Sequence, residues 1–164
     1  MNKNYSRICL TLGVSAALLA GCGIDPVQPN QDVAMAANYG IAAVVLDTLD
    51  PVNNFYIKSA DDPKAPEIEV TRVQPGVTLF VYDVPAGSYC VVHYQIANFN
   101  IDQNDPTHGS CFDVVAGKVA YSGNLAPRGH NGKIYIYQNY DWLAFEKMLK
   151  EQYPKLASIP IVTP

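Results

Sequence analysis

Two cysteines and two histidines in the middle of the chain have the residue types and the spacing that a metal site requires. Cys90 is followed three residues later by His93, and His108 is followed three residues later by Cys111. Two thiolates and two imidazoles would form a tetrahedral zinc site. Cys90 and His93 lie in a strand-like stretch, however, and an offset of three places two side chains on opposite faces of a strand. The alternatives are a disulfide between the two cysteines and two free thiols.

Other candidate chemistry is sparse. The sequence contains no glycine-rich phosphate loop and no HExxH, GxSxG or CxxC motif. His130 lies, like His108, among predicted turn residues, and no serine is marked as the nucleophile of a Ser–His–Asp arrangement. The stretch 102–105 (DQND) offers oxygen ligands to calcium, but it lacks the spacing and central glycine of an EF-hand loop. We therefore predict no catalytic residue, no metal and no cofactor.

Tyrosine is the most frequent aromatic residue, with 11 among 164 residues. Its ring and hydroxyl suit recognition surfaces, but tyrosine also favours strands for structural reasons alone. Several tyrosines recur along the predicted strands, namely Tyr82, Tyr121, Tyr135, Tyr137 and Tyr140. We favour the structural role for them, with a recognition surface as the alternative.

The composition limits the classes of function. A length of 164 residues suits one domain with appendages. Lys and Arg number 11 against 15 Asp and Glu, which gives a formal net charge of −4. A nucleic-acid-binding face needs an excess of basic residues to neutralise phosphates. The balance therefore argues against a nucleic-acid partner.

Residues 1–21 have the organisation of an export signal. Lys3 and Arg7 form a positive start, an apolar run of 12 residues follows from Ile8 to Leu19, and small residues come next. The run is shorter than the roughly 20 apolar residues that a transmembrane helix needs. We therefore predict that the mature domain lies outside the cytosol.

The end of this signal predicts a covalent anchor. Leu19-Ala20-Gly21-Cys22 resembles the lipobox of bacterial lipoproteins. The resemblance implies that Cys22 carries lipid and is the first residue of the mature protein. Two or more acyl chains hold a protein firmly on a membrane. Gly23, in place of an aspartate, implies the outer membrane, with the domain facing the periplasm.

Export also bears on the remaining cysteines. Cys9 leaves with the signal and Cys22 is taken by lipid, so Cys90 and Cys111 remain in an oxidising compartment. A bridge between them would close a loop of roughly 20 residues and stabilise the fold by about 3 kcal/mol. We therefore favour the Cys90–Cys111 disulfide over zinc and over free thiols.

After a predicted tether over residues 22–38, short strand-like runs alternate with turn signals. The runs cover residues 40–48, 55–59, 67–73, 78–84, 88–97, 112–115, 118–125 and 133–139. Their number and spacing predict an all-β domain over residues 39–139, an antiparallel β-sandwich of about seven or eight strands. Residues 140–164 are predicted to form one C-terminal α-helix and a tail.

The helix is predicted over residues 141–152. Asp141 can cap its first turn, and Pro154 cannot continue it. Its apolar residues fall on one face, at Trp142, Phe145, Met148 and Leu149. We expect this face to pack on the sandwich, with docking of a partner as the alternative.

Two turn motifs carry a family resemblance. Residues 83–91 (DVPAGSYCV) and 112–125 (FDVVAGKVAYSGNL) are similar to the P-x-G-x-Y and F-x-V-x-A-G-K-x-x-Y-x-G patterns of bacterial lipoproteins with transthyretin-like or carboxypeptidase-regulatory-like sandwiches. The similar region covers about residues 67–125. The resemblance implies a sandwich in which Gly87 and Gly117 form tight turns. It implies no catalytic residue.

These features predict a non-enzymatic envelope lipoprotein, anchored to the membrane through its N-terminal lipid. Its sandwich is expected to bind or scaffold an envelope protein partner. A binder of small ligands or polysaccharide is the first alternative, and an aromatic-lined cleft would favour it. A hydrolase is the second, and a histidine meeting an acid and a hydroxyl would favour that.

Overall fold

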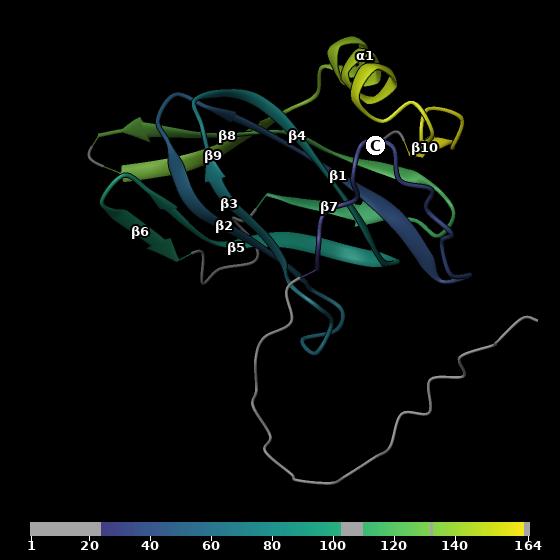
Figure 1. Ribbon diagram of the computed structural model, residues 1–164. Helices are drawn as coiled ribbons and strands as arrows, with labels where there is room; N and C mark the ends of the chain where they lie inside the picture. Colours follow the sequence, from purple (N-terminus) through teal and green to yellow (C-terminus); the bar gives the residue numbers. More distant parts are fainter. Residues whose placement is uncertain (1–23, 103–109, 132, 163–164) are drawn as a thin grey trace, which may run out of the picture.

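A computed structural model of the chain describes residues 24–102, 110–131 and 133–162 (Figure 1). The described residues form ten strands and one helix. The strands are β1 (Tyr39–Thr48), β2 (Val52–Ser59), β3 (Ile68–Val73), β4 (Gly76–Pro85), β5 (Gly87–Ile96), β6 (Phe99–Asp102), β7 (Cys111–Val114), β8 (Val119–His130), β9 (Lys133–Asn139) and β10 (Ile161–Val162). The helix is α1 (Trp142–Gln152).

The strands form two five-stranded sheets. In sheet A the order is β10-β8-β1-β4, and β9 pairs with β8; in sheet B the order is β3-β2-β5-β6, and β7 pairs with β5. The prediction of an all-β sandwich with one C-terminal helix is confirmed. The pairs β1–β8 and β8–β10 are parallel, whereas an antiparallel sandwich was predicted. Long connections that cross the fold separate these strands in sequence, and such connections permit parallel pairing.

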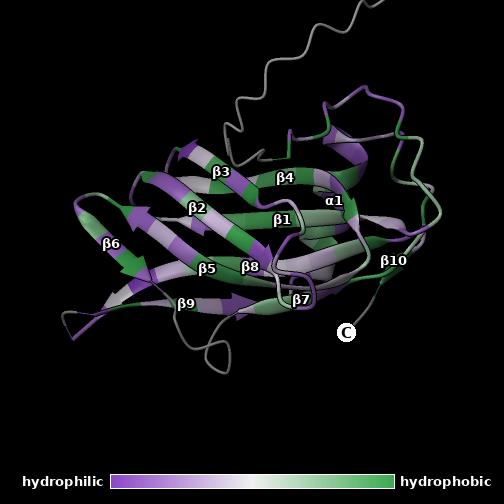
Figure 2. Cartoon of the chain, turned by 90° about the horizontal axis from the view of Figure 1, so that it is seen from below, coloured by the Kyte–Doolittle hydropathy of each residue, from purple (hydrophilic) through white to green (hydrophobic). Residues whose placement is uncertain are grey.

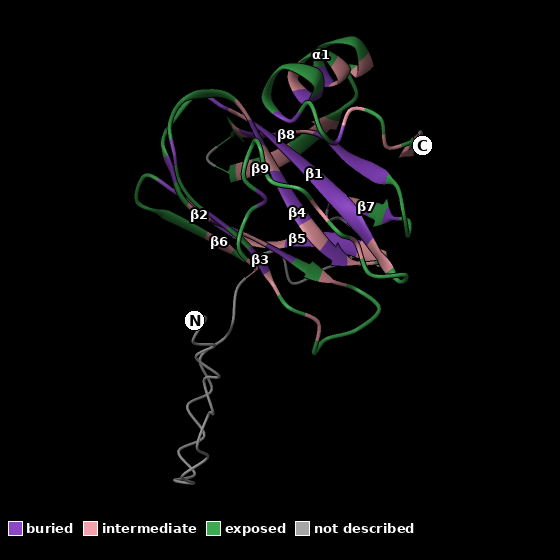
Figure 3. Cartoon of the chain, turned by 45° about the vertical axis from the view of Figure 1, so that its right-hand side comes forward, coloured by how far each residue is buried: buried purple, intermediate pink, exposed green. Residues whose placement is uncertain are grey.

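Strand β1 is buried on both of its faces. Every residue from Ile41 to Leu46 has an exposed fraction of 0%, and Figure 3 shows the strand buried along nearly its whole length. Ala42, Val44 and Leu46 belong to the core between the sheets, whereas Ile41, Ala43 and Val45 belong to a second core on the outer side of sheet A. An uninterrupted apolar run is the pattern that such a doubly covered strand requires. Figure 2 shows the central part of β1 as hydrophobic, while polar and apolar residues alternate along β2 and β3.

Helix α1 covers the outer side of sheet A, as its apolar face predicted. The Asp141 carboxylate accepts a hydrogen bond from the Ala144 amide at 3.0 Å and caps the first turn. Phe145 and Leu149 are buried in the second core, and Trp142 and Met148 pack at its border. Among the described residues, no helix has the length and apolar character needed to cross a membrane.

The segment that was predicted as a tether lies on the domain from residue 24 onward. The Val27 amide donates to the Val81 carbonyl at 2.7 Å, and the Val27 side chain is buried in the second core. Val33 and Met35 pack against the same core, and Asp32 forms an ion pair with Lys155 at 2.8 Å. The apolar residues of this proline-containing stretch thus complete the cover of sheet A, whereas an extended tether was predicted.

A bulge in β8 allows this strand to pair with two different neighbours. The register between β1 and β8 shifts between Ala43 and Val45, and the Ser122 hydroxyl accepts the Val45 amide hydrogen bond at 3.2 Å. Gly123 has a φ of +75°, and a Cβ at this position would lie 3.0 Å from the Asn139 carbonyl oxygen. Glycine is therefore required at the bulge, directly before β8 begins to pair with β9.

Candidate functional site

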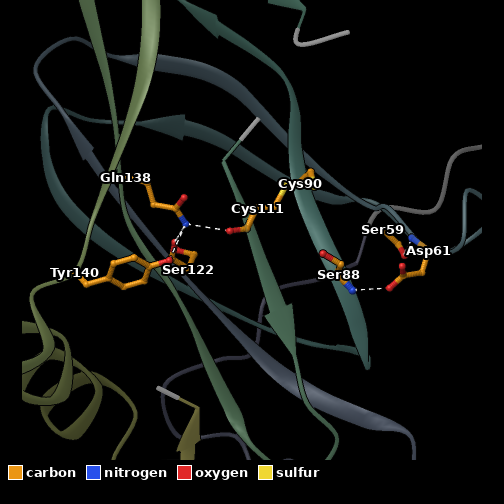
Figure 4. The surroundings of a disulfide bond; sticks show 8 residues. All are labelled: Ser59, Asp61, Ser88, Cys90, Cys111, Ser122, Gln138 and Tyr140. Carbon is orange, nitrogen blue, oxygen red and sulfur yellow. Dashed lines mark hydrogen bonds between the residues drawn. A yellow bond between two sulfur atoms is a disulfide. The ribbon is translucent and has the colours of Figure 1, made fainter. Parts of the chain in front are cut away.

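The predicted disulfide is present. Cys90 in β5 and Cys111 in β7 lie directly opposite each other in register, with Cα atoms 4.1 Å apart, and their sulfurs are bonded. Figure 4 shows the bridge between the two strands. It closes a loop of 21 residues in sequence separation, and part of that loop, residues 103–109, lies outside the described residues. Zinc ligation by these cysteines is therefore excluded while the bridge is intact.

The argument from spacing about Cys90 and His93 was wrong. The β2–β5 register places Tyr56 opposite His93 but Ile57 opposite Val91, so β5 contains a bulge between them. A bulge adds one residue and reverses the alternation of faces. Cys90 and His93 therefore share the outer face of sheet B. The second predicted pair cannot be compared in this way, because His108 lies outside the described residues.

His93 belongs to a polar network on this outer face. Its Nδ1 lies 2.5 Å from a carboxylate oxygen of Asp102, and its ring centroid lies 5.5 Å from that of Tyr56. The Tyr56 hydroxyl donates to Glu69 at 2.9 Å, and this bond is the main cause of a raised pKa of Tyr56. Lys58 pairs with Glu67 at 3.1 Å. The network crosses four strands of sheet B.

The geometry of this network gives no support to hydrolysis. His93 meets an acid and stands beside a tyrosine, but the Tyr56 hydroxyl is bonded to Glu69 rather than to the imidazole. A nucleophile must be within hydrogen-bond reach of its base. The other described histidine, His130, has a separate partner in Asn131. In the part of the chain that the structure describes, no three His, Cys, Asp or Glu residues are grouped as a metal site.

The tyrosines divide into two groups. Tyr82, Tyr89 and Tyr94 are buried in the core between the sheets, and burial raises the pKa of Tyr89 to about 12. The ring of Tyr121 stacks on Phe145 with centroids 4.1 Å apart. Tyr135, Tyr137 and Tyr140 are instead exposed. The structural explanation therefore holds for the first group, and the recognition alternative remains for the second.

Four turns lie at one end of the sandwich, namely those that connect β1 to β2, β3 to β4, β5 to β6 and β8 to β9. Thr48 pairs with Gly76, Val52 pairs with both Val73 and Ile96, and Ile96 pairs with Phe99. The turn between β8 and β9 extends past the same end. Five large apolar side chains are exposed here: Leu49 (70%), Val77 (54%), Phe99 (61%), Tyr135 (45%) and Tyr137 (51%). We call this end, defined by these five residues, the tip.

A groove of about 510 Å³ opens at the tip, between the β5–β6 turn and the β8–β9 turn. Ile96, Phe99, Pro127 and Ile134 supply its apolar wall, and Asp50, His130 and Lys133 supply its polar groups. A second groove of about 390 Å³ continues along β6 and shares Phe99, Lys133 and Ile134 with the first. No role was predicted for Phe99 from the sequence. Its signal was an aromatic residue in an otherwise polar stretch, between Asn98 and Asn100.

A third cavity of about 360 Å³ lies near the disulfide, between β7, β8 and Tyr140. Gln138 bridges the two sheets beside it: the Gln138 amide nitrogen donates to the carbonyl oxygens of Cys111 at 3.1 Å and Ser122 at 2.6 Å (Figure 4). The same nitrogen lies 3.2 Å from the Tyr140 hydroxyl. The bond to Cys111 holds β9 against sheet B, and the Cys111 carbonyl and Tyr140 hydroxyl, which line this cavity, are thus engaged within the fold.

Cys22, the predicted lipid attachment site, lies outside the described residues. The chain is described from Ile24, and the Ile24 amide donates to the Glu67 carbonyl at 3.2 Å. Glu67 directly precedes β3. The first residue of β3, Ile68, pairs with Ile57 near the C-terminal end of β2. The predicted anchor is thus two residues away from a fixed point at the end of the sandwich opposite the tip.

In comparisons with known proteins, no family model and no curated protein matches the chain. Among solved structures, the chain is similar to a crystal structure of a leucine-rich repeat protein from Bacteroides thetaiotaomicron, with 16% sequence identity and a TM-score of 0.38. The match covers 71% of this chain and 16% of that chain. A likeness at this level carries no argument about fold or function.

Proposed function

We propose that the chain is a lipid-anchored lipoprotein of the bacterial envelope, whose sandwich is a non-enzymatic binding module for an envelope protein. The anchor rests on the signal-like residues 1–21 and on the lipobox-like residues 19–22. The observation that carries the binding role is the tip, where five large apolar side chains are exposed and one of them, Phe99, also lines a groove. Apolar patches rimmed by polar residues are typical of protein interaction sites.

The chemistry of the tip favours a protein partner with an apolar surface. Phe99, Tyr135 and Tyr137 supply aromatic area, and aromatic residues are enriched at the energetic centres of interfaces. Lys133 and His130 stand at the rim of the groove, where polar groups fix orientation. Binding of this kind requires no nucleophile, metal or cofactor.

The family resemblance remains part of this proposal. Gly87 and Gly117, the glycines of the two turn motifs, have φ values of +152° and +71°. Only glycine adopts such backbone conformations without strain. These turns support a relation to transthyretin-like or carboxypeptidase-regulatory-like domains of bacterial lipoproteins.

Photo-crosslinking tests the binding role. A benzophenone amino acid is placed at Tyr137 on the tip or at Tyr56 on the outer face of sheet B, in the full chain in bacterial cells. We expect one discrete adduct with an envelope protein from position 137 and none from position 56. Equal labelling from both positions, or no adduct from 137, would refute a binding role for the tip.

The anchor is tested separately. Wild-type protein should incorporate palmitate and sediment with the membranes, whereas Cys22→Ser should lose both properties. If the Cys22→Ser protein still sediments with the membranes, the lipid anchor is wrong, whatever the tip binds.

Polysaccharide is a second candidate ligand, and it is favoured by the arrangement of Tyr135 and Tyr137. The two exposed rings lie at i and i+2 on one face of β9, about 7 Å apart along the strand. Co-sedimentation of the soluble domain with purified cell-wall polymer would support this candidate. Loss of that binding in Tyr135→Ala and Tyr137→Ala would assign it to these rings.

A further inference from the structure

The start of the folded chain is fixed at two points. The Ile24 amide is bonded to the Glu67 carbonyl at 3.2 Å, and the Val27 amide is bonded to the Val81 carbonyl at 2.7 Å. Val27 is 5% exposed and lies in the second core. Residues 24–27 therefore run along the edge of the domain as part of it.

This docking shortens the connection to the lipid. The inference rests on the proposed anchor at Cys22. Because consecutive Cα atoms are 3.80 Å apart, the Cα atom of Cys22 lies at most about 7.6 Å from that of Ile24. A lipid on Cys22 thus brings the bilayer surface close to Ile24 and Glu67. We call the end of the sandwich formed by Ile24 and residues 60–67 the base.

The base and the tip lie at opposite ends of the strands. Glu67 pairs with Lys58, which lies opposite Cys90 in β5, whereas Phe99 lies opposite Ile96 at the other end of β5. The six residue steps from Cys90 to Ile96 correspond to about 20 Å of strand. Figure 1 shows the β2–β3 loop and the β5–β6 and β8–β9 turns at separate ends of the molecule.

The acidic residues of the base are engaged within the protein. The Asp61 carboxylate accepts a hydrogen bond from the Ser88 amide at 2.7 Å (Figure 4). The Asp62 carboxylate accepts the Lys64 amide hydrogen bond at 2.9 Å, and Glu67 is paired with Lys58. Of these partners, Lys58 offsets the charge of Glu67 and so reduces the repulsion that this carboxylate would meet at an anionic lipid surface.

From these observations we infer that the base is the lipid-facing surface, and that the docked N-terminal segment holds the tip pointing away from the bilayer. A long free tether would leave the domain without a preferred orientation. The docked segment instead fixes which end a lipid surface contacts and which end a partner can reach.

Quenching of a fluorescent label by the membrane tests this orientation. The lipidated full chain is reconstituted in phosphatidylethanolamine–phosphatidylglycerol vesicles that contain a nitroxide-headgroup lipid. One label is attached through Lys64→Cys at the base, and the other through Lys133→Cys at the tip; both positions are exposed. We expect several-fold stronger quenching at position 64 than at position 133. Equal quenching, or stronger quenching at position 133, would overturn the inference.

Two variants separate orientation from anchoring and from folding. Val27→Asp places a charge in the second core and should release the segment, so quenching at position 64 falls to the level at position 133 while vesicle binding persists. Asn30→Asp adds the same charge at an exposed position and should leave the quenching difference unchanged. If Val27→Asp leaves the quenching difference intact while its far-ultraviolet circular dichroism is native, the docked segment does not set the orientation. Absence of vesicle binding in the wild-type chain would instead refute the proposed anchor.

Discussion

The outer faces of the two sheets differ in what covers them. The outer face of sheet A is covered by α1 and by residues 24–38, which together bury a second apolar core. The outer face of sheet B carries a polar network of Tyr56, Glu69, His93 and Asp102, and its strands are held by a disulfide. We infer that apolar burial stabilises the outer side of sheet A. Sheet B, whose outer face is polar, gains stability from the Cys90–Cys111 disulfide.

The largest effect is expected from the covered face. Phe145 is fully buried and stacks on Tyr121, so Phe145→Ala should lower the free energy of unfolding by about 3–5 kcal/mol. Leu143, on the same helix, is 84% exposed, and Leu143→Ala should change the free energy of unfolding little. Urea denaturation of the soluble domain measures both variants. Equal losses would mean that α1 does not stabilise the fold through its buried face.

The bridge on the open face should contribute somewhat less. Replacement of Cys90 and Cys111 by alanine should lower the free energy of unfolding by about 3 kcal/mol, because the unfolded chain loses a constraint on a loop of roughly 20 residues. Denaturation of the double variant and of the wild type in reductant should give matching losses. If the free energy of unfolding falls by less than about 1 kcal/mol in both, the disulfide does not stabilise sheet B as proposed.

A smaller effect, of opposite sign, is expected from Asp83. This residue lies opposite Ile41 on the covered face, its Oδ1 atom is buried, and within the described residues Oδ1 makes no hydrogen bond. Burial raises the pKa of the Asp83 carboxyl above its usual value of 3.8. The folded state then holds the proton more tightly than the unfolded state. The stabilisation is present below the unfolded pKa and is lost as the pH rises through the folded pKa.

Asp83→Asn removes this charge. The variant should raise the free energy of unfolding by about 1 kcal/mol at pH 7, because a neutral amide is buried at lower cost than a charged carboxylate. It should have little effect at pH 3, where the wild-type carboxyl is protonated. Denaturation curves at the two pH values provide the test, and an equal gain at both would show that the charge is not the cause.

The smallest effect is expected from the network on the open face. Tyr56→Phe removes the hydrogen bond to Glu69 from an exposed surface. The free energy of unfolding should fall by no more than about 0.5 kcal/mol, as is usual for surface changes. Ultraviolet titration should show one phenol fewer with a pKa above 10.0 in this variant than in the wild type, because only the Tyr56 phenol is removed. A loss of several kcal/mol would mean that the open face stabilises the fold as strongly as the covered one.

Much of the local structure was predictable from local patterns. All eight predicted strand runs occur, the cap at Asp141 lies where it was expected, and α1 buries Phe145 and Leu149. Three features were missed, and one of them is the exposed Phe99 at the groove. The bulge in β5 moved His93 to the face of Cys90, and residues 24–38 docked on sheet A. Both depend on partners distant in sequence, which a local pattern does not contain.

The order of residues alone indicated eight of the ten described strands, where the helix starts, and which two thiols can pair in an exported chain. Alternation, capping and cysteine number are local properties, so they can be read without a fold. Only the tertiary structure decided that Leu49, Phe99 and Tyr137 lie at one end and that Ile24 lies at the other. Strand register and bulges set these positions, and both are chosen by packing between distant segments.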